Sequence, residues 1–213
     1  IDGNVGHSAG DQICFTGYPS GPSPDTNVMP SCGSYAAKQL QHLNTAMPAY
    51  VMIPKNVPGT GSAWLGKSYA AFETLADPAA TGPFKIPNFT FADGVDAGRL
   101  GERKALLDTL NNPDLAESMK NLGDYQNQAL GILSSGKARA AFDLDSEPQS
   151  LRDRYGFMPA FDPGDPQRCG APNWAQRMLL SRRLVEAGVR MVTVDLRWWD
   201  FHKQGFDSQK RGF

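Results

Sequence analysis

The sequence predicts an α/β protein containing part of a doubly wound, mostly parallel sheet. The run at 49–53 is short, apolar and bounded by prolines, as the buried strands of parallel sheets are. Later, a helical pattern over 174–187 reaches Gly188 and passes directly into a β-branched run at 190–196, which is half of a βαβ unit. Segments rich in glycine and proline separate these elements, so we expect a helix-rich fold with long loops.

The N-terminal third predicts two helices and a short turn. Residues 7–17 form a short helical pattern in which Gly17 serves as a left-handed C-cap. A proline-rich loop follows, and Ser31 is then a good N-cap for a helix to about Leu43 that would bury Tyr35. Residues 64–72 suggest a short turn or helix.

Four further helices are expected. Asp96 caps a pattern that continues to residue 110, and a second pattern runs over 113–133 until Ser-Ser-Gly ends it. A short helix begins at 147–148 and ends at 155–156, and 174–187 carries the strongest helical pattern. The stripe expected to face the core in this last helix comprises Trp174, Met178, Ser181 and Val185, with Leu184 beside it.

Strands are scarce for a parallel sheet, since only 49–53 and 190–196 are convincing. A strand as apolar as 191–194 expects parallel neighbours on both edges and helices on both faces. Two strands cannot supply these neighbours. We therefore expect residues 1–213 to be a single segment of a larger α/β domain, whose partner is the remainder of its own polypeptide or a larger assembly.

Composition narrows the classes of partner. The formal net charge of −1 gives no reason to expect nucleic acid as a partner, and no apolar run is long enough for a membrane span. Cys14, Cys32 and Cys169 match no zinc motif. A Cys14–Cys32 disulfide would form in an oxidising compartment, and buried free thiols are the alternative.

Potential metal ligands follow the last strand. Asp200 and His202 are two residues apart, which in extended chain places both side chains on one face, as two ligands of one divalent ion require. Asp195, inside the strand, is expected to be structural. Trp198 and Trp199 are either core cover or the walls of a pocket. His42 is expected to be an ordinary helix-surface residue.

Several motifs resemble the alkaline phosphatase superfamily. His-Ser-Ala-Gly at 7–10 followed by Thr-Gly at 16–17 resembles its nucleophile helix, whose N-terminus stabilises an anionic group. Counting back nine residues from the threonine, as in sulfatases, reaches His7. The strings Leu-Arg-Asp-Arg-Tyr-Gly at 151–156 and Arg-Arg-Leu-Val-Glu-Ala-Gly-Val-Arg at 182–190, with Trp-Asp-Phe-His at 199–202, resemble a sulfatase-like bacterial family of unknown function within that superfamily.

The resemblance implies an alkaline-phosphatase-like fold with a metal-bearing cleft at the carboxyl edge of its sheet. Asp200 and His202 would bind part of a divalent ion (zinc, calcium or magnesium). The first strand and the C-terminal half of the metal site would lie outside residues 1–213, and the protein would be exported. His7 occupies the nucleophile position and is a candidate nucleophile, metal ligand or general acid, with Ser8 as the substitute if the helix starts one residue later.

The sequence thus predicts a metal-dependent hydrolase of sulfate or phosphate esters, with a small anionic ester or a sulfated carbohydrate as substrate. Arg190, Arg197 or Lys203 would pair with the anion, unless each is simply a solvated surface charge. The alternative is a non-catalytic exported protein, structural or carbohydrate-binding, that retains the fold. A third interpretation is a stable fragment whose function belongs to a larger assembly.

Overall fold

The structure is a computed structural model of the chain. The residues that it describes are 6–43, 46–80, 82–87, 89, 96, 98–99, 101–102, 105–106, 127–157, 175–195, 206 and 210.

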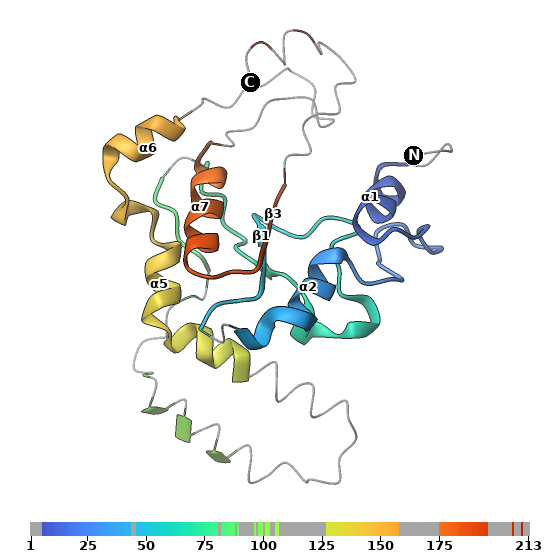
Figure 1. Cartoon of the computed structure of the whole chain (residues 1–213), viewed down its shortest axis with the longest axis horizontal. Coiled ribbons are helices and arrows are strands. Elements are labelled where there is room, and N and C mark those ends of the chain that lie inside the picture. Colours follow the sequence, from blue (N-terminus) through green and yellow to red (C-terminus); the bar gives the residue numbers. More distant parts are fainter. Residues whose placement is uncertain are drawn as a thin grey trace.

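A small parallel sheet lies at the centre of the molecule (Figure 1). Its strands are β1 (Tyr50–Ile53), β2 (Phe72–Glu73) and β3 (Met191–Val194), in the order β2-β1-β3. Both pairings of β1 are parallel, with Val51 opposite Phe72 on one side and Val192 on the other. The α/β class and both predicted strands are confirmed, while β2 was not predicted.

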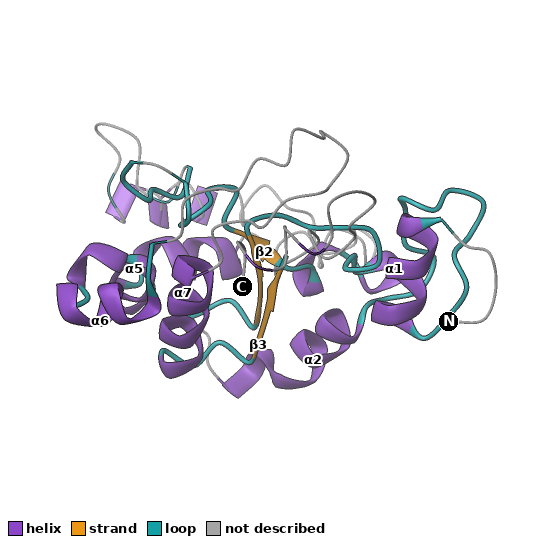
Figure 2. Cartoon of the chain, turned by 90° about the horizontal axis from the view of Figure 1, so that it is seen from above, coloured by secondary structure: helices purple, strands orange, loops and turns teal. Residues whose placement is uncertain are grey.

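Helices cover the sheet on both sides (Figures 1 and 2). α5, α6 and α7 lie on one side, and α1 and α2 lie on the other. Residues 127–134 are also helical. The bounds of the labelled helices are α1 His7–Thr16, α2 Cys32–Leu40, α5 Gly136–Phe142, α6 Gln149–Tyr155 and α7 Ala175–Glu186.

Capping residues set the ends of these helices. Gly17 ends α1 with a left-handed φ of 75°, and the Ser31 hydroxyl accepts a hydrogen bond from the Ser34 N–H at the start of α2. After α7, the Gly188 and Val189 N–H groups donate to the carbonyls of Val185 and Leu184, both at 2.9 Å. This paired pattern closes α7 and turns the chain directly into β3.

The core consists of two hydrophobic clusters, one on each face of the sheet, because successive side chains of β1 point to opposite faces. Val51 and Ile53 are fully buried in the cluster that includes Leu180 and Leu184 of α7. Tyr50 points to the other face, where it packs with Ala37 of α2. Successive side chains of a strand point to opposite faces, so an all-apolar strand needs cover on both.

Close approach of α2 to the sheet requires a glycine. A Cβ added to Gly33 would lie 2.3 Å from the Tyr50 ring, nearer than any real contact permits. The Tyr50 ring is itself 1% exposed and has no room to move. The Gly33–Tyr50 contact therefore fixes how closely α2 packs against β1.

Two sequence predictions were wrong in detail. The α7 stripe expected in the core includes Met178 and Val185, which are exposed, whereas Leu179 and Leu180 are fully buried. Tyr35 of α2 is exposed rather than buried. The expected helix end at 134–136 is confirmed, because residues 127–134 are helical and Ser135 is not. Ser135 also begins α5, since its hydroxyl accepts a hydrogen bond from the Ala138 N–H at 3.1 Å.

Other predictions lie wholly or partly outside the described residues. The predicted helices at 96–110 and 113–133 lie mostly outside the described residues. Short stretches of them are described, such as the helical residues 127–133. That residues 1–213 are one segment of a larger domain stays a prediction. In the part of the chain that the structure describes, no helix is long and apolar enough to cross a membrane.

Candidate functional site

The first candidate segment is the N-terminus of α1. His7 and Ser8 are its first two residues, and Gly6 is an extended N-cap that supplies no side-chain hydrogen bond. His7 is exposed and Ser8 is partly exposed. When no side chain caps the start of a helix, backbone N–H groups of the first turn can donate hydrogen bonds to a ligand. The helix dipole favours a negatively charged ligand at this end.

α1 is anchored by two amide side chains. Gln12 is 1% exposed, and its Nε2 donates to the Pro24 carbonyl and, at 3.2 Å, to the Thr26 carbonyl. Asn27, next in the same loop, accepts from the Gly59 N–H at 3.0 Å through Oδ1 and donates to the Gly59 carbonyl at 2.9 Å through Nδ2. These bonds fix the 18–30 loop between α1 and the loop after β1.

Gly59 brings α1 against the segment that leaves the carboxyl end of β1. A Cβ at this position would lie 2.6 Å from the Asp11 carbonyl oxygen of α1, and its φ of +92° also favours glycine. The α1 helix is thus in direct contact with the loop that begins where β1 ends. Ligands of open parallel sheets collect at this edge.

The carboxyl end of β3 is fixed by a buried arginine. Arg177 of α7 makes a two-point ion pair with Asp77, its Nε donating to Oδ1 at 2.8 Å and its Nη2 to Oδ2. Its Nη1 donates to the Asp195 carbonyl at 2.7 Å, and the Asp195 N–H donates to the Ile53 carbonyl at 2.8 Å. Arg177 therefore sets the position from which the chain continues toward Asp200, and the structural role expected for Asp195 fits these backbone bonds.

The predicted metal ligands Asp200 and His202 lie outside the described residues, as do Trp198, Trp199, Arg197, Lys203 and Cys169. Among the residues that the structure does describe, no three or more His, Cys, Asp or Glu residues are grouped so that they could hold a metal ion. The pairing of Asp200 and His202 around a divalent ion stays a prediction.

The remaining sequence candidates lie apart from the α1 terminus. His42 is exposed in a short 3-10 turn after α2, and Arg190 donates to the Leu43 carbonyl at 3.4 Å. Cys14 and Cys32 are free thiols, and both are exposed. The suggestion of buried thiols was therefore wrong for these two cysteines, because each lies on the solvent face of its helix.

One titratable group was not anticipated. Burial raises the pKa of the Tyr50 hydroxyl above its ordinary value, although the hydrogen bond with Thr193 acts in the opposite direction. The Thr193 Oγ1 donates to the Tyr50 oxygen at 3.3 Å, which joins β1 to β3 on the α2 side of the sheet. This hydroxyl lies inside the packed core, so we assign it a structural role.

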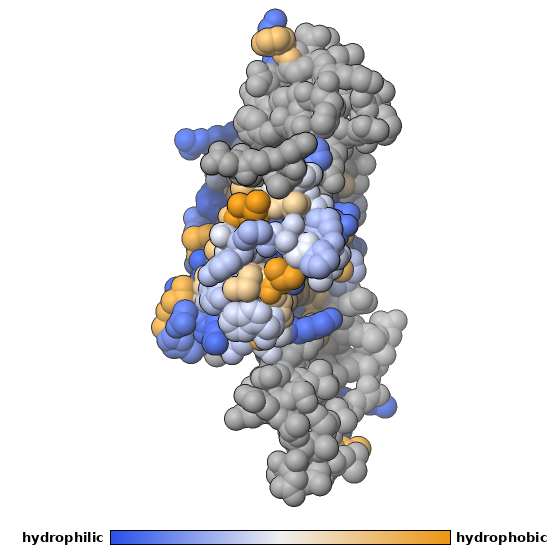
Figure 3. Space-filling view, turned by 90° about the vertical axis from the view of Figure 1, so that its right-hand side faces the viewer, coloured by the Kyte–Doolittle hydropathy of each residue, from blue (hydrophilic) through white to orange (hydrophobic). Residues whose placement is uncertain are grey.

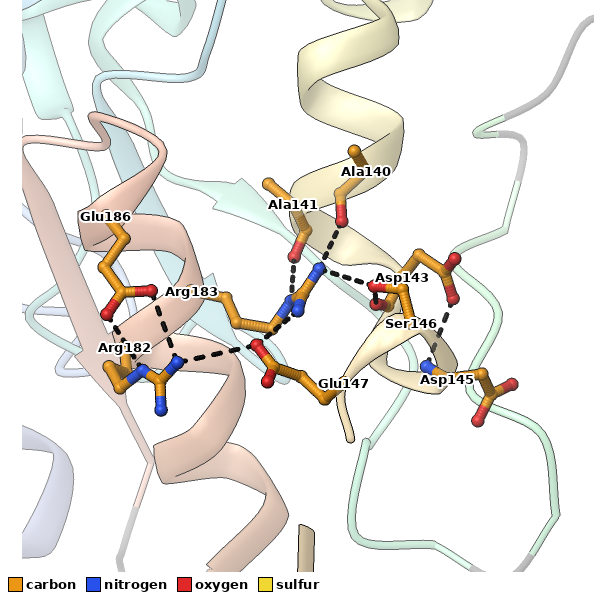
Figure 4. Close-up of polar contacts among 9 residues, drawn as sticks. All are labelled: Ala140, Ala141, Asp143, Asp145, Ser146, Glu147, Arg182, Arg183 and Glu186. Atoms are coloured by element: carbon orange, nitrogen blue, oxygen red, sulfur yellow. Dashed lines mark hydrogen bonds and ion pairs between the residues drawn. The ribbon is translucent and has the colours of Figure 1, made fainter. Parts of the chain in front are cut away.

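Sequence reasoning also missed a cluster of charged residues between α5 and α7 (Figure 4). Arg183 pairs with Glu147 and donates to the Ala140 and Ala141 carbonyls at the end of α5. Arg182 reaches the same Glu147 carboxylate at 3.6 Å and pairs with Glu186 at 3.0 Å. The arrangement caps α5 and joins it to α7, and it explains the paired arginines structurally.

An exposed aromatic pair lies on the α2 side. Trp64 is 62% exposed and Tyr35 is 39% exposed, and their rings meet edge to face with centroids 6.2 Å apart. On the face that includes α1 and α2, hydrophobic residues form small separate spots among hydrophilic ones (Figure 3). The Trp64 and Tyr35 rings thus form an exposed aromatic pair.

Comparison with known proteins identifies the family. A model of the family described as "Protein of unknown function (DUF1501)" matches residues 2–212, and the chain belongs to that family. No curated protein and no solved structure matches the chain.

The assignment to a sulfatase-like family of the alkaline phosphatase superfamily is therefore wrong, because the family that matches is DUF1501. The strings that suggested it have a local structural explanation. Residues 151–156 form most of α6 and its C-terminal glycine, and 182–190 contain the end of α7 and its capping turn. The residues of these strings therefore form helices and helix caps, and their pattern does not by itself indicate a catalytic site.

Proposed function

We propose that this protein is a metal-dependent hydrolase of sulfate or phosphate esters, with its site at the carboxyl edge of a doubly wound, mostly parallel sheet. The observation that carries the proposal is the placement of α1. Its N-terminus bears His7 and Ser8, and its body packs through Gly59 on the loop leaving the carboxyl end of β1. Such a terminus suits the anionic group of an ester.

The second half of the proposed site comes from β3. This strand is parallel to β1, so both end at the same edge of the sheet. The chain leaving β3 past Asp195 leads within seven residues to Asp200 and His202. A carboxylate and an imidazole suit zinc, and the carboxylate also suits magnesium or calcium, with further ligands required in each case. Such an ion would supply Lewis acidity toward the ester oxygen.

Two residues compete for the role of nucleophile. The His7 imidazole is exposed at the first position of α1, and the Ser8 hydroxyl follows it in the same turn. Attack by either group on the sulfur or phosphorus would break the bond to the ester oxygen, release the alcohol and form a covalent sulfo- or phospho-enzyme. Water would then hydrolyse this intermediate and release sulfate or phosphate. His7 has the other proposed roles of metal ligand and general acid, so single variants of both residues are needed to separate the roles.

The test is turnover of 4-nitrophenyl sulfate and 4-nitrophenyl phosphate by the full-length protein with added zinc, magnesium or calcium. We expect turnover with one of these ions and a loss of about 100-fold or more in the variant of the nucleophile, His7→Ala or Ser8→Ala. His42→Ala, an exposed histidine outside the site, should retain the wild-type rate. If both α1 variants also retain that rate, the proposed site is wrong.

A binding protein for carbohydrates is the second candidate, favoured by the Trp64–Tyr35 pair. The flat apolar face of a sugar ring can stack on an exposed indole, and Trp64 is the more exposed of the two aromatic residues. In this case the protein would be exported and would bind a sulfated or neutral polysaccharide without turnover. Absence of turnover, together with polysaccharide binding that Trp64→Ala abolishes, would favour this candidate over the hydrolase.

A further inference from the structure

A cavity of about 590 Å³ lies along β2, on the open edge of the described sheet. We call it the β2 cavity. Phe72 and Glu73 of β2 line one side, and Ile132 and Leu133 of the 127–134 helix line another. Its volume falls within the range of pockets that bind small molecules, and α1 contributes no residue to its described lining. It is therefore a candidate site beyond the one proposed above.

The walls of the β2 cavity are mainly apolar. Phe72 packs edge to face on Phe89 with ring centroids 5.8 Å apart, and both rings also contact Phe142. Phe72 and Phe89 line the cavity, so part of its wall is formed by this aromatic cluster. A planar apolar ligand would find matching surfaces there.

Glu73 supplies a fixed negative charge in this apolar setting. Its Oε1 accepts a hydrogen bond from the Asn56 N–H at 2.7 Å, which holds the carboxylate in place. Lys67 also lines the cavity, but it is exposed and extends on a flexible stem, so water solvates its charge. The carboxylate is the charge that a ligand would meet in a defined position.

Leu75 contributes a second, independent observation. Its backbone is left-handed with a φ of 53°, which is rare for leucine, and its N–H donates to the Pro54 carbonyl at 2.8 Å. Leu75 is 63% exposed and lines the cavity. Leu75 thus keeps an apolar side chain exposed beside an apolar cavity, in a backbone conformation that is rare for leucine. Such an arrangement is expected where a bound ligand covers the side chain.

We propose that the β2 cavity binds a small organic cation with a planar apolar body, of the aryl-alkylammonium class. The aromatic body packs against Phe72, Phe89 and Leu75, and the ammonium group pairs with Glu73. The proposal is independent of ester hydrolysis, since it uses none of the residues assigned to that reaction.

Two probes with the same ring and opposite charge test it. Isothermal titration calorimetry of the full-length protein with tryptamine and with indole-3-propionate compares the ammonium with the carboxylate. We expect tryptamine to bind about tenfold more tightly. Equal affinities, tighter binding of indole-3-propionate, or no saturable binding of tryptamine would overturn the proposal.

Two charge variants identify the group responsible. Glu73→Gln keeps an oxygen that can accept from the Asn56 N–H, and it should bring the affinity ratio of the two probes close to one. Lys67→Gln should leave tryptamine the tighter ligand. A ratio that Glu73→Gln leaves unchanged would show that the charge preference does not arise from Glu73, and would overturn the proposal.

A third variant fills the cavity. Ala70 lines it, and Ala70→Trp should weaken binding of tryptamine at least tenfold by occupying the space of the ring. The thermal unfolding midpoint of each variant checks that it is folded. If a folded Ala70→Trp protein binds tryptamine as wild type does, the ligand lies elsewhere and the proposal fails.

Discussion

At the scale of single residues, Tyr50 shows how burial and pairing determine chemistry. Its ring packs over Gly33, and its hydroxyl accepts a hydrogen bond from Thr193 inside the core. Removing a hydroxyl from water disfavours its ionised form, so burial raises the pKa of Tyr50. Tyr50 therefore stays protonated in the folded protein at a pH where tyrosines of the unfolded chain have begun to ionise.

This difference in pKa predicts a loss of stability at alkaline pH. Above about pH 10 the unfolded chain loses the Tyr50 proton while the folded protein keeps it, so the free energy of unfolding falls as pH rises. The contribution is fully present below pH 10 and is lost as pH climbs toward the raised pKa. Urea unfolding between pH 8 and 11 measures it. Tyr50→Phe should show a shallower decline than wild type, and an identical decline would contradict this account.

Side-chain chemistry explains which residue-level predictions failed. The buried side of α7 includes Gln176 and Arg177, which a search for apolar stripes passes over. Both are buried because they find partners: the Gln176 amide donates to the Gly156 carbonyl at 2.8 Å, and Arg177 pairs with Asp77, a hundred residues away in sequence. No local pattern predicts such distant partners, so the stripe was assigned to the wrong side of the helix.

At the scale of elements, the contact between α5 and α7 depends on Arg183. The Arg183 side chain is 14% exposed and that of Glu147 is 9% exposed, so their ion pair is largely withdrawn from water. The same guanidinium donates to two carbonyls at the C-terminal end of α5, where a positive charge complements the helix dipole. One side chain thus links two helices and the turn between α5 and α6 (Figure 4).

Removing this side chain should be costly. Arg183→Ala leaves the buried Glu147 carboxylate without its nearest partner and removes a charged donor from two helix-end carbonyls, so we expect a loss of about 3 kcal/mol in the free energy of unfolding. Arg182→Ala is the matched control, because Arg182 is more exposed and its partner Glu186 is mostly in solvent. Urea unfolding of both variants gives the comparison. Equal losses in the free energy of unfolding would show that the Arg183 contacts stabilise the fold no more than those of Arg182.

Elements were predictable where a local signal defined them. The glycine caps of α1 and α6 and the serine cap of α2 are local, and the sequence predicted those helices. The helix end at Ser-Ser-Gly was predicted correctly, but the start of α5 at the same residues was not, since only the bond from the Ala138 N–H to Ser135 reveals that cap. The β2 strand has two residues and exists through its pairing with β1, which no short pattern reveals.

At the scale of the whole molecule, the parallel sheet organises the candidate sites. β1 and β3 end at one edge, where the loop after β1 contacts α1 and Arg177 fixes the chain leaving β3. The sequence predicted the two strands and the importance of this edge. It did not predict the contacts made by Asn27, Gly59 and Arg177, because each joins segments far apart in the chain. That His7, Asp200 and His202 lie together in one site stays a prediction.

The central claim is that the protein binds a divalent ion through Asp200 and His202, and the metal content of the purified full-length protein tests it most directly. Inductively coupled plasma mass spectrometry after dialysis should find about one equivalent of zinc, calcium or magnesium per wild-type chain. The Asp200→Ala, His202→Ala double variant should retain less than about a tenth of that amount, whereas His42→Ala should retain all of it. No bound divalent ion in the wild-type protein, or an unchanged content in the double variant, would contradict the claim.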